Sequence, residues 1–585
     1  MILGFSGLEK SRQFKLDRLP DLDPREYAIT QGADAAAALV LGGEVVGAAA
    51  QERFDGVKHS AGFPAGPAGA ALAVAGRKPA DLDLVAHAFS FEAEREFYTG
   101  RSGYHRDLYD EALSPQVNQR IAEQALDVDL TGKFLPVPHH VAHAASAYYP
   151  SGYDDALVLV SDGLGERYSA TVFAASRRGF EVVSQVPANS SLGVLYGVFT
   201  LYLGFAFGDG EYKVMGLAPH GDASRYAGTI LREWVSLDPD GRYRVPLLLE
   251  NTTELDRETH RGAIAALERV LGPRRLPHTP IEQRHRDVAA GLQAVLNQAL
   301  LHQLDHHRGR TGLRRLCLAG GVALNCVANG VLLRSRIFDD IYVQPAAGDD
   351  GAALGAALVG ATELGDRPVA GRTTALGSSY DPEQCRDAVE RAPDVSVRYT
   401  GSEAELLAST AELIADGKVI GWFQGPMEFG PRALGGRSIL ADPRRSDMRD
   451  RINSLVKKRE SFRPFAPAVP EEAAAELFEI APEDAHRFAH MLFVAHVRPE
   501  HAARMPATTH VDGSARVQTV ARADAPLFWG LLHAFGDLTG LPVVLNTSFN
   551  VAGQPIVRTP DQAIETFLAA GLDALVIDGM VVSAR

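Results

Sequence analysis

Three histidines fall within five positions of the stretch PHHVAHAASAYYP, and two of them, His139 and His143, are four residues apart. On a helix this spacing places both imidazoles on one face, where they can bind the same cation. Asp162 in VSDGLG and Asp349 in AAGDDGA each lie at the end of a predicted strand, so their carboxylates could converge there. A cation site of two histidines and two aspartates is one interpretation, and a hydrogen-bonded polar pair on a helix is the other.

Glycine-rich turns form a second candidate site. Gly320 and Gly321 follow the apolar run LCLA, and residues 348–351 follow IYVQPAA. Glycine lets backbone N–H groups approach a phosphate, and both turns are predicted at the carboxyl ends of strands, where open α/β sheets bind ligands. They are candidates for a nucleotide cradle, and tight strand-to-helix turns account for them about equally well.

Arginine and lysine become dense beyond residue 420 in an otherwise acidic chain. GPRALGGRS and LVKKRESFRPFAP place them among Gly, Pro and Phe, a setting that holds a guanidinium rigid, as two-pronged recognition of phosphate requires. NTSFN, residues 546–550, adds hydroxyl and amide groups after the apolar strand LPVVL. Solvated surface charge is the alternative to a polyanion pocket. The cationic members of this region are Arg432, Arg437, Lys457, Lys458, Arg459 and Arg463.

Two strand-turn-strand units must position these residues. MILGFSG precedes DAAAALVLGGEVVGAAAQERF, in which Gly42 and Gly43 indicate a hairpin, and DDALVLVSDGLGERYSATVFAAS repeats the plan. The repetition predicts a duplicated lobe. Residues 281–304 have helical spacing, and both LCLAGGVALNCVANGVLL and IYVQPAAGDDGAALGAALVGA predict a strand, a turn and a helix.

The 585 residues exceed what one hydrophobic core usually supports, so two or more domains are expected. Between about residues 365 and 403 the chain becomes richer in Pro, Gly, Ser and Thr and loses clear periodicity, which predicts a linker. The predicted division is a first domain over residues 1–370, a linker region over 371–400 and a second domain over 401–585.

The charge balance, 58 basic against 73 acidic side chains, gives a net charge of -15, the wrong sign for wrapping nucleic acid. The three cysteines are too few and too scattered for a disulfide framework or a zinc cluster. No apolar run approaches the roughly 20 residues that span a bilayer, and the start lacks the pattern of a signal peptide. The composition therefore predicts a cytoplasmic protein with no nucleic-acid or membrane partner.

Eight ordered motifs together resemble one family, the NodU/CmcH-type O-carbamoyltransferases of antibiotic and nodulation-factor biosynthesis. The resemblance covers essentially the whole chain. The motifs are QERFDGVKHSAGFP, HHVAHAASAYYPSGYDDALVLVSDGLGE, GEYKVMGLAPHG, LAGGVALNCVANG, QPAAGDDGAALGAAL, GPMEFGPRALGGRSILADPR, RESFRPFAPAV and LNTSFN.

The resemblance implies an α/β protein with an N-terminal two-lobed domain of the actin/sugar-kinase-like (ASKHA) superfold and a C-terminal YrdC-like α/β domain. The C-terminal domain would make carbamoyl-adenylate from carbamoyl phosphate and ATP, and the other would transfer the carbamoyl group to an alcohol. The implied cofactors are ATP, Mg²⁺ and one divalent transition metal, Fe²⁺, Zn²⁺ or Mn²⁺. The implied acceptor is a small molecule such as a macrolide, ansamycin, aminoglycoside or cephem alcohol, and a homodimer stays open.

Carried over residue by residue, the resemblance assigns His139, His143, Asp162 and Asp349 to the metal. It assigns catalytic roles to Asp34, Arg432, Lys457, Arg463 and Arg516. Nucleotide or carbamoyl phosphate binding falls to Gly163, Gly320, Gly321, Asn325, Arg459, Ser548 and Asn550, since KKR and SFN resemble the Lys-x-Arg and Ser-x-Asn patterns of YrdC-type domains.

One position departs from the family pattern. The family usually has His-Asp-Ala-Ser at the first hairpin, and this chain has Ala33 where the histidine would take the proton of the acceptor. Either another group takes that proton or Ala33 is a deliberate substitution.

Three rival functions are weighed against carbamoyl transfer. In a fused tRNA threonylcarbamoylation enzyme both domain types recur, but the acidic charge and insertions such as SFEAEREFYTGRSGYHRDLYDEAL favour a small acceptor. A hydrogenase-maturation enzyme would have an acylphosphatase-like start and zinc-finger cysteine pairs. A catalytically silent nucleotide-binding protein is the third rival, because of Ala33.

Overall fold

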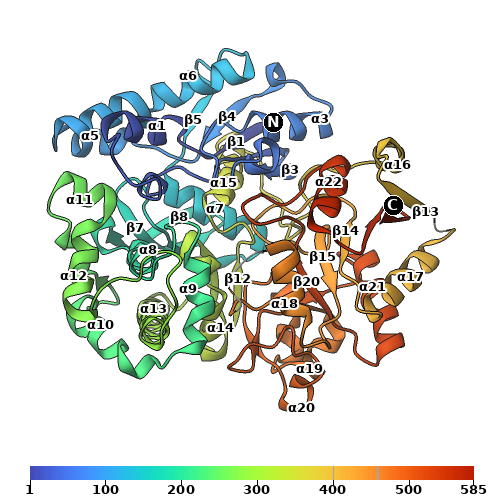
Figure 1. Ribbon diagram of the computed structural model, residues 1–585. Helices are drawn as coiled ribbons and strands as arrows, with labels where there is room; N and C mark the ends of the chain where they lie inside the picture. Colours follow the sequence, from blue (N-terminus) through green and yellow to red (C-terminus); the bar gives the residue numbers. More distant parts are fainter. Residues whose placement is uncertain (400, 458–459, 461) are drawn as a thin grey trace. The chain divides into compact units, whose positions relative to one another are not determined.

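The computed structural model describes residues 1–399, 401–457, 460 and 462–585, and the fold is α/β. The chain forms two compact units. Unit 1 consists of Met1–Glu52 and His59–Arg372, and unit 2 of Arg53–Lys58 and Thr373–Arg585. Apart from its short Arg53–Lys58 segment, unit 2 is coloured from yellow to red in Figure 1. In the described part of the chain, no helix has the length and apolarity needed to cross a membrane.

Unit 1 contains two five-stranded sheets with one topology. The first has the order β3-β2-β1-β4-β5, and the second, read from β8, has the order β8-β7-β6-β11-β12. In each sheet the first three strands along the chain are antiparallel, and the last two run parallel to the first. The strands are β1 Ile2–Phe5, β2 Ala36–Leu41, β3 Glu44–Ala50, β4 Leu84–His87, β5 Phe134–Pro136, β6 Asp155–Ser161, β7 Tyr168–Ser176, β8 Gly179–Pro187, β11 Arg315–Ala319 and β12 Asp340–Val343. The predicted duplicated lobe is confirmed, and unit 1 has the two-lobed architecture of an actin/sugar-kinase-like domain.

The predicted first hairpin is present because Gly42 and Gly43 close it with φ values of 58° and 85°. A two-residue turn with two positive φ angles has the twist that antiparallel strands require. At Gly43 a Cβ atom would also lie 2.0 Å from the carbonyl oxygen of Arg367, so only glycine fits there.

Helix α15 (Asp349–Glu363) packs against helix α7 (His139–Ser151) and against strands β1 and β2. Figure 1 shows α15 beside α7 and β1. Glycine makes this close approach possible. A Cβ atom on Gly355 would lie 1.7 Å from the carbonyl oxygen of Ala142 in α7, and one on Gly4 would lie 2.2 Å from that of Ala353. The small residues of the motif GAALGAAL therefore fix how closely α15 sits to its neighbours.

Unit 1 contains further helices besides α7 and α15. The helix predicted over residues 281–304 is α13, which extends to Thr311 and ends at Gly312 with φ 73°. The longer helices are α1 Glu9–Arg18, α3 Ala65–Val74, α6 Pro115–Leu126, α8 Leu192–Tyr202, α9 Glu211–Leu217, α10 Ala227–Glu233, α11 Glu254–Thr259, α12 Arg261–Leu271, α13 Gln283–Thr311 and α14 Cys326–Ser335.

Unit 2 is built on a mixed sheet with the order β13-β22-β21-β14-β15-β20-β16-β19. Helices α17 (Glu403–Ala415) and α21 (Pro526–Thr539) share one hydrophobic core with this sheet, and α16 (Pro382–Arg391) and α22 (Pro560–Ala570) share another. The strands are β13 Val395–Tyr399, β14 Ile420–Phe423, β15 Arg437–Ala441, β16 Ala466–Pro470, β19 Gln518–Val520, β20 Val544–Ser548, β21 Ala574–Ile577 and β22 Met580–Ala584. Buried apolar residues on both faces explain why these strands are short apolar runs.

The segment predicted as a linker, residues 371–400, carries regular structure of its own. It contains α16 and β13, and β13 pairs antiparallel with β22 near the end of the chain. In β13 the burial changes along VSVRY from buried Val395 to exposed Tyr399, as in an edge strand. This exposed edge has too few apolar residues to stand out as a periodic element in the sequence.

Candidate active site

The edge of the second sheet of unit 1 carries three of the predicted features. Asp162 directly follows β6, Gly320 and Gly321 directly follow β11, and Asp349 begins α15 after β12. Because β6, β11 and β12 are parallel neighbours, their carboxyl ends meet at one edge. The fourth feature, the histidine motif, forms the first turns of α7.

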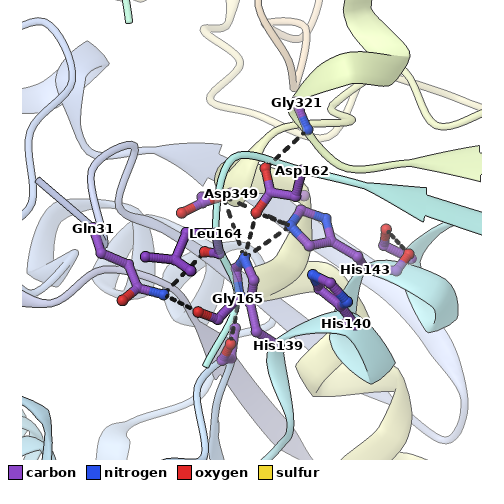
Figure 2. Close-up of polar contacts among 12 residues, drawn as sticks. Gln31, His139, His140, His143, Asp162, Leu164, Gly165, Gly321 and Asp349 are labelled. Carbon is purple, nitrogen blue, oxygen red and sulfur yellow. Dashed lines mark hydrogen bonds and ion pairs between the residues drawn. The ribbon is translucent and has the colours of Figure 1, made fainter. Parts of the chain in front are cut away.

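Four side chains converge at this edge, as Figure 2 shows. The Nε2 atom of His139 lies 3.2 Å from Oδ2 of Asp162 and 3.4 Å from Oδ1 of Asp349. The Nε2 atom of His143 lies 3.9 Å and 3.6 Å from the same two oxygens, and 3.1 Å from Nε2 of His139. The four ligand atoms lie within 4.8 Å of one another. The structure therefore brings together all four residues that the sequence assigned to a metal.

The surroundings hold these ligand atoms in place. The Nδ1 atom of His139 donates to the carbonyl oxygen of Ala88 over 2.9 Å, which leaves Nε2 for a ligand, and Phe89 stacks on the same ring at 4.1 Å. The backbone N–H of Gly321 donates to Oδ1 of Asp162 over 3.2 Å, so that Oδ2 faces the histidines. Outer partners of this kind fix the tautomer and orientation of metal ligands.

The donor set fits a divalent cation. Two carboxylates in a buried site cost free energy unless a positive charge neutralises them. Burial lowers the pKa of His139, but Asp349 and Asp162 outweigh that effect and raise this pKa well above its ordinary value. Burial raises the pKa of Asp162, but the hydrogen bond from His139 and the charges of His143 and His139 together outweigh burial and lower this pKa. The site thus combines two nitrogen and two oxygen ligands with a need for positive charge. Such a ligand set is typical of Fe²⁺, Zn²⁺ or Mn²⁺.

The third histidine of the motif does not belong to this set. His140 lies on the same helix, but its Nδ1 atom pairs with the hydroxyl of Thr171 at 2.8 Å. Burial, and then the charge of His139, lower the pKa of His140 to about 3, so this imidazole is neutral. The spacing of four residues, rather than the number of histidines, was the informative signal.

Glu166 is a site residue that the sequence analysis missed. Its Oε1 atom accepts the backbone N–H of His139 over 2.7 Å and that of Ser90 over 2.9 Å. Burial raises the pKa of this carboxyl group. A carboxylate at the first N–H group of α7 satisfies an otherwise unpaired donor at the end where the helix dipole favours negative charge. The only signal in the sequence was its place at the end of the motif VSDGLGE.

The residues of the predicted nucleotide cradle lie at the same edge of the sheet. Gly320 has φ 86°, and a Cβ atom there would lie 2.4 Å from the carbonyl oxygen of Ser161. Asn325 caps α14 by accepting the N–H of Ala328 over 3.0 Å, and its amide pairs with Gln293. Together with Gly163 these residues line the edge that holds the four ligands, and their contact with a nucleotide stays a prediction.

Asp34 lies on a loop that reaches this edge. In the same loop, the side-chain amide of Gln31 donates to the carbonyl oxygens of Leu164 and Gly165 over 3.0 Å and 2.8 Å (Figure 2). The carboxylate of Asp34 pairs with Nδ1 of His59 at 2.8 Å. His59 is a second residue that the sequence analysis missed.

In unit 2 the predicted phosphate-binding residues flank one edge of the sheet. The start of β15 lies beside the end of β20, because the two strands are antiparallel and Ser438 pairs with Ser548. The start of β16 lies beside that same end of β20, and β19 runs parallel to β16. Arg432 precedes β15, Arg463 precedes β16, Arg516 precedes β19, and Ser548 with Asn550 ends β20. Arg432 and Asn550 are 118 positions apart in the sequence. The directions of the strands nevertheless bring all five residues to one edge of the sheet.

Hydrogen bonds hold this edge together. Asn546 donates to the carbonyl oxygen of Ala433 over 3.1 Å and to Gln518 over 2.7 Å, which ties the Arg432 loop to β20 and β19. The carboxylate of Glu428 accepts the N–H groups of Leu434 and Gly436 over 2.8 Å and 2.7 Å. The hydroxyl of Ser548 donates to Oδ1 of Asn550 over 2.7 Å. Lys458, Arg459 and the side chain of Lys457 lie outside the described residues.

Arg437 differs from the other members of the predicted basic pocket. Its side chain is fully buried, its guanidinium stacks 3.7 Å from the ring centre of Phe423, and it donates to four backbone carbonyl oxygens. Burial lowers its pKa to about 10. Arg437 is a structural cation, which explains its place at the start of a buried strand.

Comparison with known proteins matches both units to one family. Residues 29–358 match the model described as Carbamoyltransferase N-terminus, and residues 411–584 match Carbamoyltransferase C-terminus. The chain belongs to the carbamoyltransferase family. The two matches enclose all the predicted site residues of this carbamoyltransferase. The four candidate metal ligands His139, His143, Asp162 and Asp349, which we call the metal quartet, lie in the N-terminal match, and the basic edge of unit 2 lies in the C-terminal match.

Relatives of this carbamoyltransferase include nodulation proteins. The chain is 39% identical over 608 residues to nodulation protein NolNO of Sinorhizobium fredii, covering 100% of this chain and 83% of that protein. It is 45% identical over 449 residues to nodulation protein NolO of Bradyrhizobium diazoefficiens, covering 76% and 79%. It is 38% identical over 598 residues to the uncharacterized protein sll1178 of Synechocystis, covering 94% and 95%.

Proposed function

We propose that this carbamoyltransferase makes carbamoyl-adenylate from carbamoyl phosphate and ATP and transfers the carbamoyl group to a hydroxyl of a small natural product. The observation that carries the proposal is the basic edge of unit 2. In a protein with a net charge of -15, Arg432, Arg463 and Arg516 flank the same edge as the Ser548–Asn550 pair. Such a cluster in an acidic protein fits a polyanionic substrate.

The chemistry explains why ATP would be used. Carbamoyl phosphate is a weak donor toward a neutral alcohol at neutral pH. Water would first cleave carbamoyl phosphate to carbamate and inorganic phosphate. A carbamate oxygen would then attack the α-phosphorus of ATP, forming a C–O–P link and releasing pyrophosphate. Arg463 and Arg516, with Lys457, would neutralise the charge that develops on the phosphates, with Mg²⁺ as the counter-ion. Arg432 would share their catalytic role, and Arg459, Ser548 and Asn550 would bind the nucleotide and carbamoyl phosphate.

Transfer would take place in the N-terminal domain, predicted over residues 1–370. The predicted linker covers residues 371–400, and the predicted YrdC-like domain covers residues 401–585. His139, His143, Asp162 and Asp349 would hold one divalent cation. That cation would supply a Lewis acid for a carbonyl or phosphate oxygen. Gly163, Gly320, Gly321 and Asn325 would accept the adenylate at the strand ends. The three cysteines, all free, fit a reducing cytoplasm.

The decisive experiment follows the donor half of the reaction. Purified protein is incubated with ATP, Mg²⁺ and carbamoyl phosphate without an acceptor, and carbamoyl-adenylate is sought by mass spectrometry together with pyrophosphate. We expect both products, and we expect Arg516→Ala to lower both at least tenfold relative to the exposed-surface control Arg177→Ala. If ATP binds but neither product forms, the adenylate route is refuted and a silent nucleotide-binding protein is favoured.

A further inference from the structure

A histidine between two aspartates stands near the position where the family histidine is missing. The Nδ1 atom of His59 lies 2.8 Å from Oδ1 of Asp34, and its Nε2 atom lies 3.8 Å from Oδ1 of Asp209. The hydroxyl of Tyr212 donates to the same oxygen of Asp209 over 3.0 Å. The side chains of His59, Asp34 and Asp209, which we call the acid–base trio, are 39%, 40% and 38% exposed. The trio is therefore ordered by its own contacts and still open to a substrate.

The backbone around the trio is held in an unfavourable conformation. Asp34 and His59 are both non-glycine residues in the left-handed region, with φ values of 58° and 55°. Their loops are locked together, since the N–H of Ala35 donates to the carbonyl oxygen of Ser60 over 2.7 Å and the N–H of Gln51 donates to that of Ala35 over 2.7 Å. A left-handed residue costs about 1 kcal/mol or more, and such conformations persist at functional sites where the surroundings impose them.

The trio also lies beside the metal quartet. Its loop is tied by Gln31 to the segment that follows Asp162 (Figure 2). Strand β2, which begins two residues after Asp34, packs against helix α15, whose first residue is the candidate ligand Asp349. A hydroxyl bound at the trio would therefore stand next to the edge where the carbamoyl group is expected.

The charge of the trio decides which group can take a proton. An imidazole with a carboxylate at each nitrogen keeps both its protons, because each carboxylate favours the cation. Asp34 chiefly, and also Asp209, raise the pKa of His59 to about 11 against the opposing effect of burial. Glu52 adds a third carboxylate, which accepts the backbone N–H of His59 over 3.5 Å. His59 is thus a cation at neutral pH, and the proton acceptor of the trio is a carboxylate.

We propose that Asp34 takes the proton of the acceptor hydroxyl, and that His59 and Asp209 are the positioning residues that replace the histidine absent at Ala33. The inference rests on the proposed function. The hydroxyl oxygen forms a bond to the carbamoyl carbon, the bond from that carbon to the phosphate oxygen breaks, and the electron pair stays on AMP. The proton passes to the free carboxylate oxygen of Asp34, and His59 keeps its charge throughout.

The test uses methanol as the acceptor, because it needs no specific binding site. The full-length protein receives ¹³C-labelled carbamoyl phosphate, ATP and Mg²⁺, and methyl carbamate and pyrophosphate are measured in parallel. We expect Asp34→Asn to lower methyl carbamate formation about 100-fold and His59→Asn about 10-fold, and both to leave the pyrophosphate released in the first turnover within about twofold. Asparagine tolerates the left-handed backbone. Asp127→Asn and His278→Asn, left-handed residues away from the site, are the matched controls.

The pH dependence separates positioning from a purely structural role. With His59 as a fixed cation, the rate of methyl carbamate formation should not rise through pH 6.5, and in His59→Asn its pH profile should change shape. A rise near pH 6.5 that vanishes in His59→Asn would make the neutral imidazole the base and overturn the assignment. Unchanged methyl carbamate in Asp34→Asn would also overturn it. If methyl carbamate forms without pyrophosphate, the proposed adenylate route is refuted. The role of Asp34 is then decided by the Asp34→Asn variant alone.

Discussion

At the scale of single residues, this protein gives similar histidines very different tasks. His139 and His143 face carboxylates, whereas the neighbouring His140 faces a threonine hydroxyl. His260 is buried and pairs with the amide of Asn251 at 3.2 Å, and burial, with a smaller effect of Lys15, lowers its pKa to about 4. Burial disfavours the imidazolium in every case, and a nearby carboxylate reverses that preference. The partner, rather than the residue type, therefore decides whether a histidine is charged.

Removing one ligand should empty the proposed metal site. His143→Ala and Asp349→Asn each leave three of the four ligand atoms, so we expect the metal measured by inductively coupled plasma mass spectrometry to fall by at least tenfold per protein. His140→Gln, one position from a ligand on the same helix, is the matched control and should keep its metal. Equal metal content in all three variants would show that the quartet is not where the metal binds.

Buried neutral histidines should make the protein acid-sensitive, and His260 tests this. Because its folded-state pKa of about 4 lies below the unfolded value, stability is unaffected above pH 6.5 and is lost as the pH falls from 6.5 toward 4. We expect His260→Asn, which keeps the left-handed backbone, to reduce the slope of unfolding free energy against pH by up to about 1.4 kcal/mol per unit between pH 4.5 and 6. Urea titrations at several pH values measure it, with His278→Asn as control. An unchanged slope would contradict the assignment.

The convergence of the four candidate metal ligands could be predicted at the residue scale because each of them carried a local signal. The histidines had helical spacing, and each aspartate closed an apolar strand. His59 and Glu166 had no such signal. His59 and Asp34 are 25 positions apart, and both are left-handed loop residues. Residue types other than glycine rarely adopt this conformation, so the sequence gives no sign of it.

At the scale of elements, the position of α15 determines the geometry of the site. Its first residue is the ligand Asp349, and Gly355, less than two turns later, touches the backbone of α7, which carries both histidines. The two helices are therefore coupled through one glycine contact. The sequence predicted α15 and its small residues, and the spacing of the two histidines suited a helix at α7, since these patterns are local.

Substitution of Gly355 should disturb the site without touching a ligand. In Gly355→Ala the new methyl group would lie 1.7 Å from the carbonyl oxygen of Ala142, so α15 must move away from α7. We expect a loss of about 3 kcal/mol in unfolding free energy together with lower metal content. Gly69→Ala in the exposed face of α3 meets no atom within 4 Å and should be neutral or slightly stabilising. Thermal unfolding and metal analysis test this prediction. A Gly355→Ala protein with unchanged stability and metal content would refute the coupling of α15 to α7.

At the scale of the whole molecule, the segments that form one unit are not all consecutive in the sequence. Residues 53–58 belong to unit 2, although the chain on either side of them belongs to unit 1. β13 likewise pairs with β22, about 180 residues further along the chain. The composition predicted a boundary over residues 371–400, but it could not show either of these distant associations, since neither segment has a periodic pattern of its own.

The segment Arg53–Lys58 should stabilise unit 2 through two contacts. A guanidinium N–H of Arg53 donates to the carbonyl oxygen of Gly430 over 3.0 Å, and the guanidinium of Arg558 lies 4.3 Å from the ring centre of Phe54. In Phe54→Ala the cation–π contact is lost, so we expect faster hydrogen exchange of the peptides around Arg558 by a factor that corresponds to about 1 kcal/mol, with no change in the strands of unit 1. Val57→Ala, exposed in the same segment, is the matched control. If exchange around Arg558 is the same in both variants, the segment does not stabilise unit 2, and its place there has another physical cause.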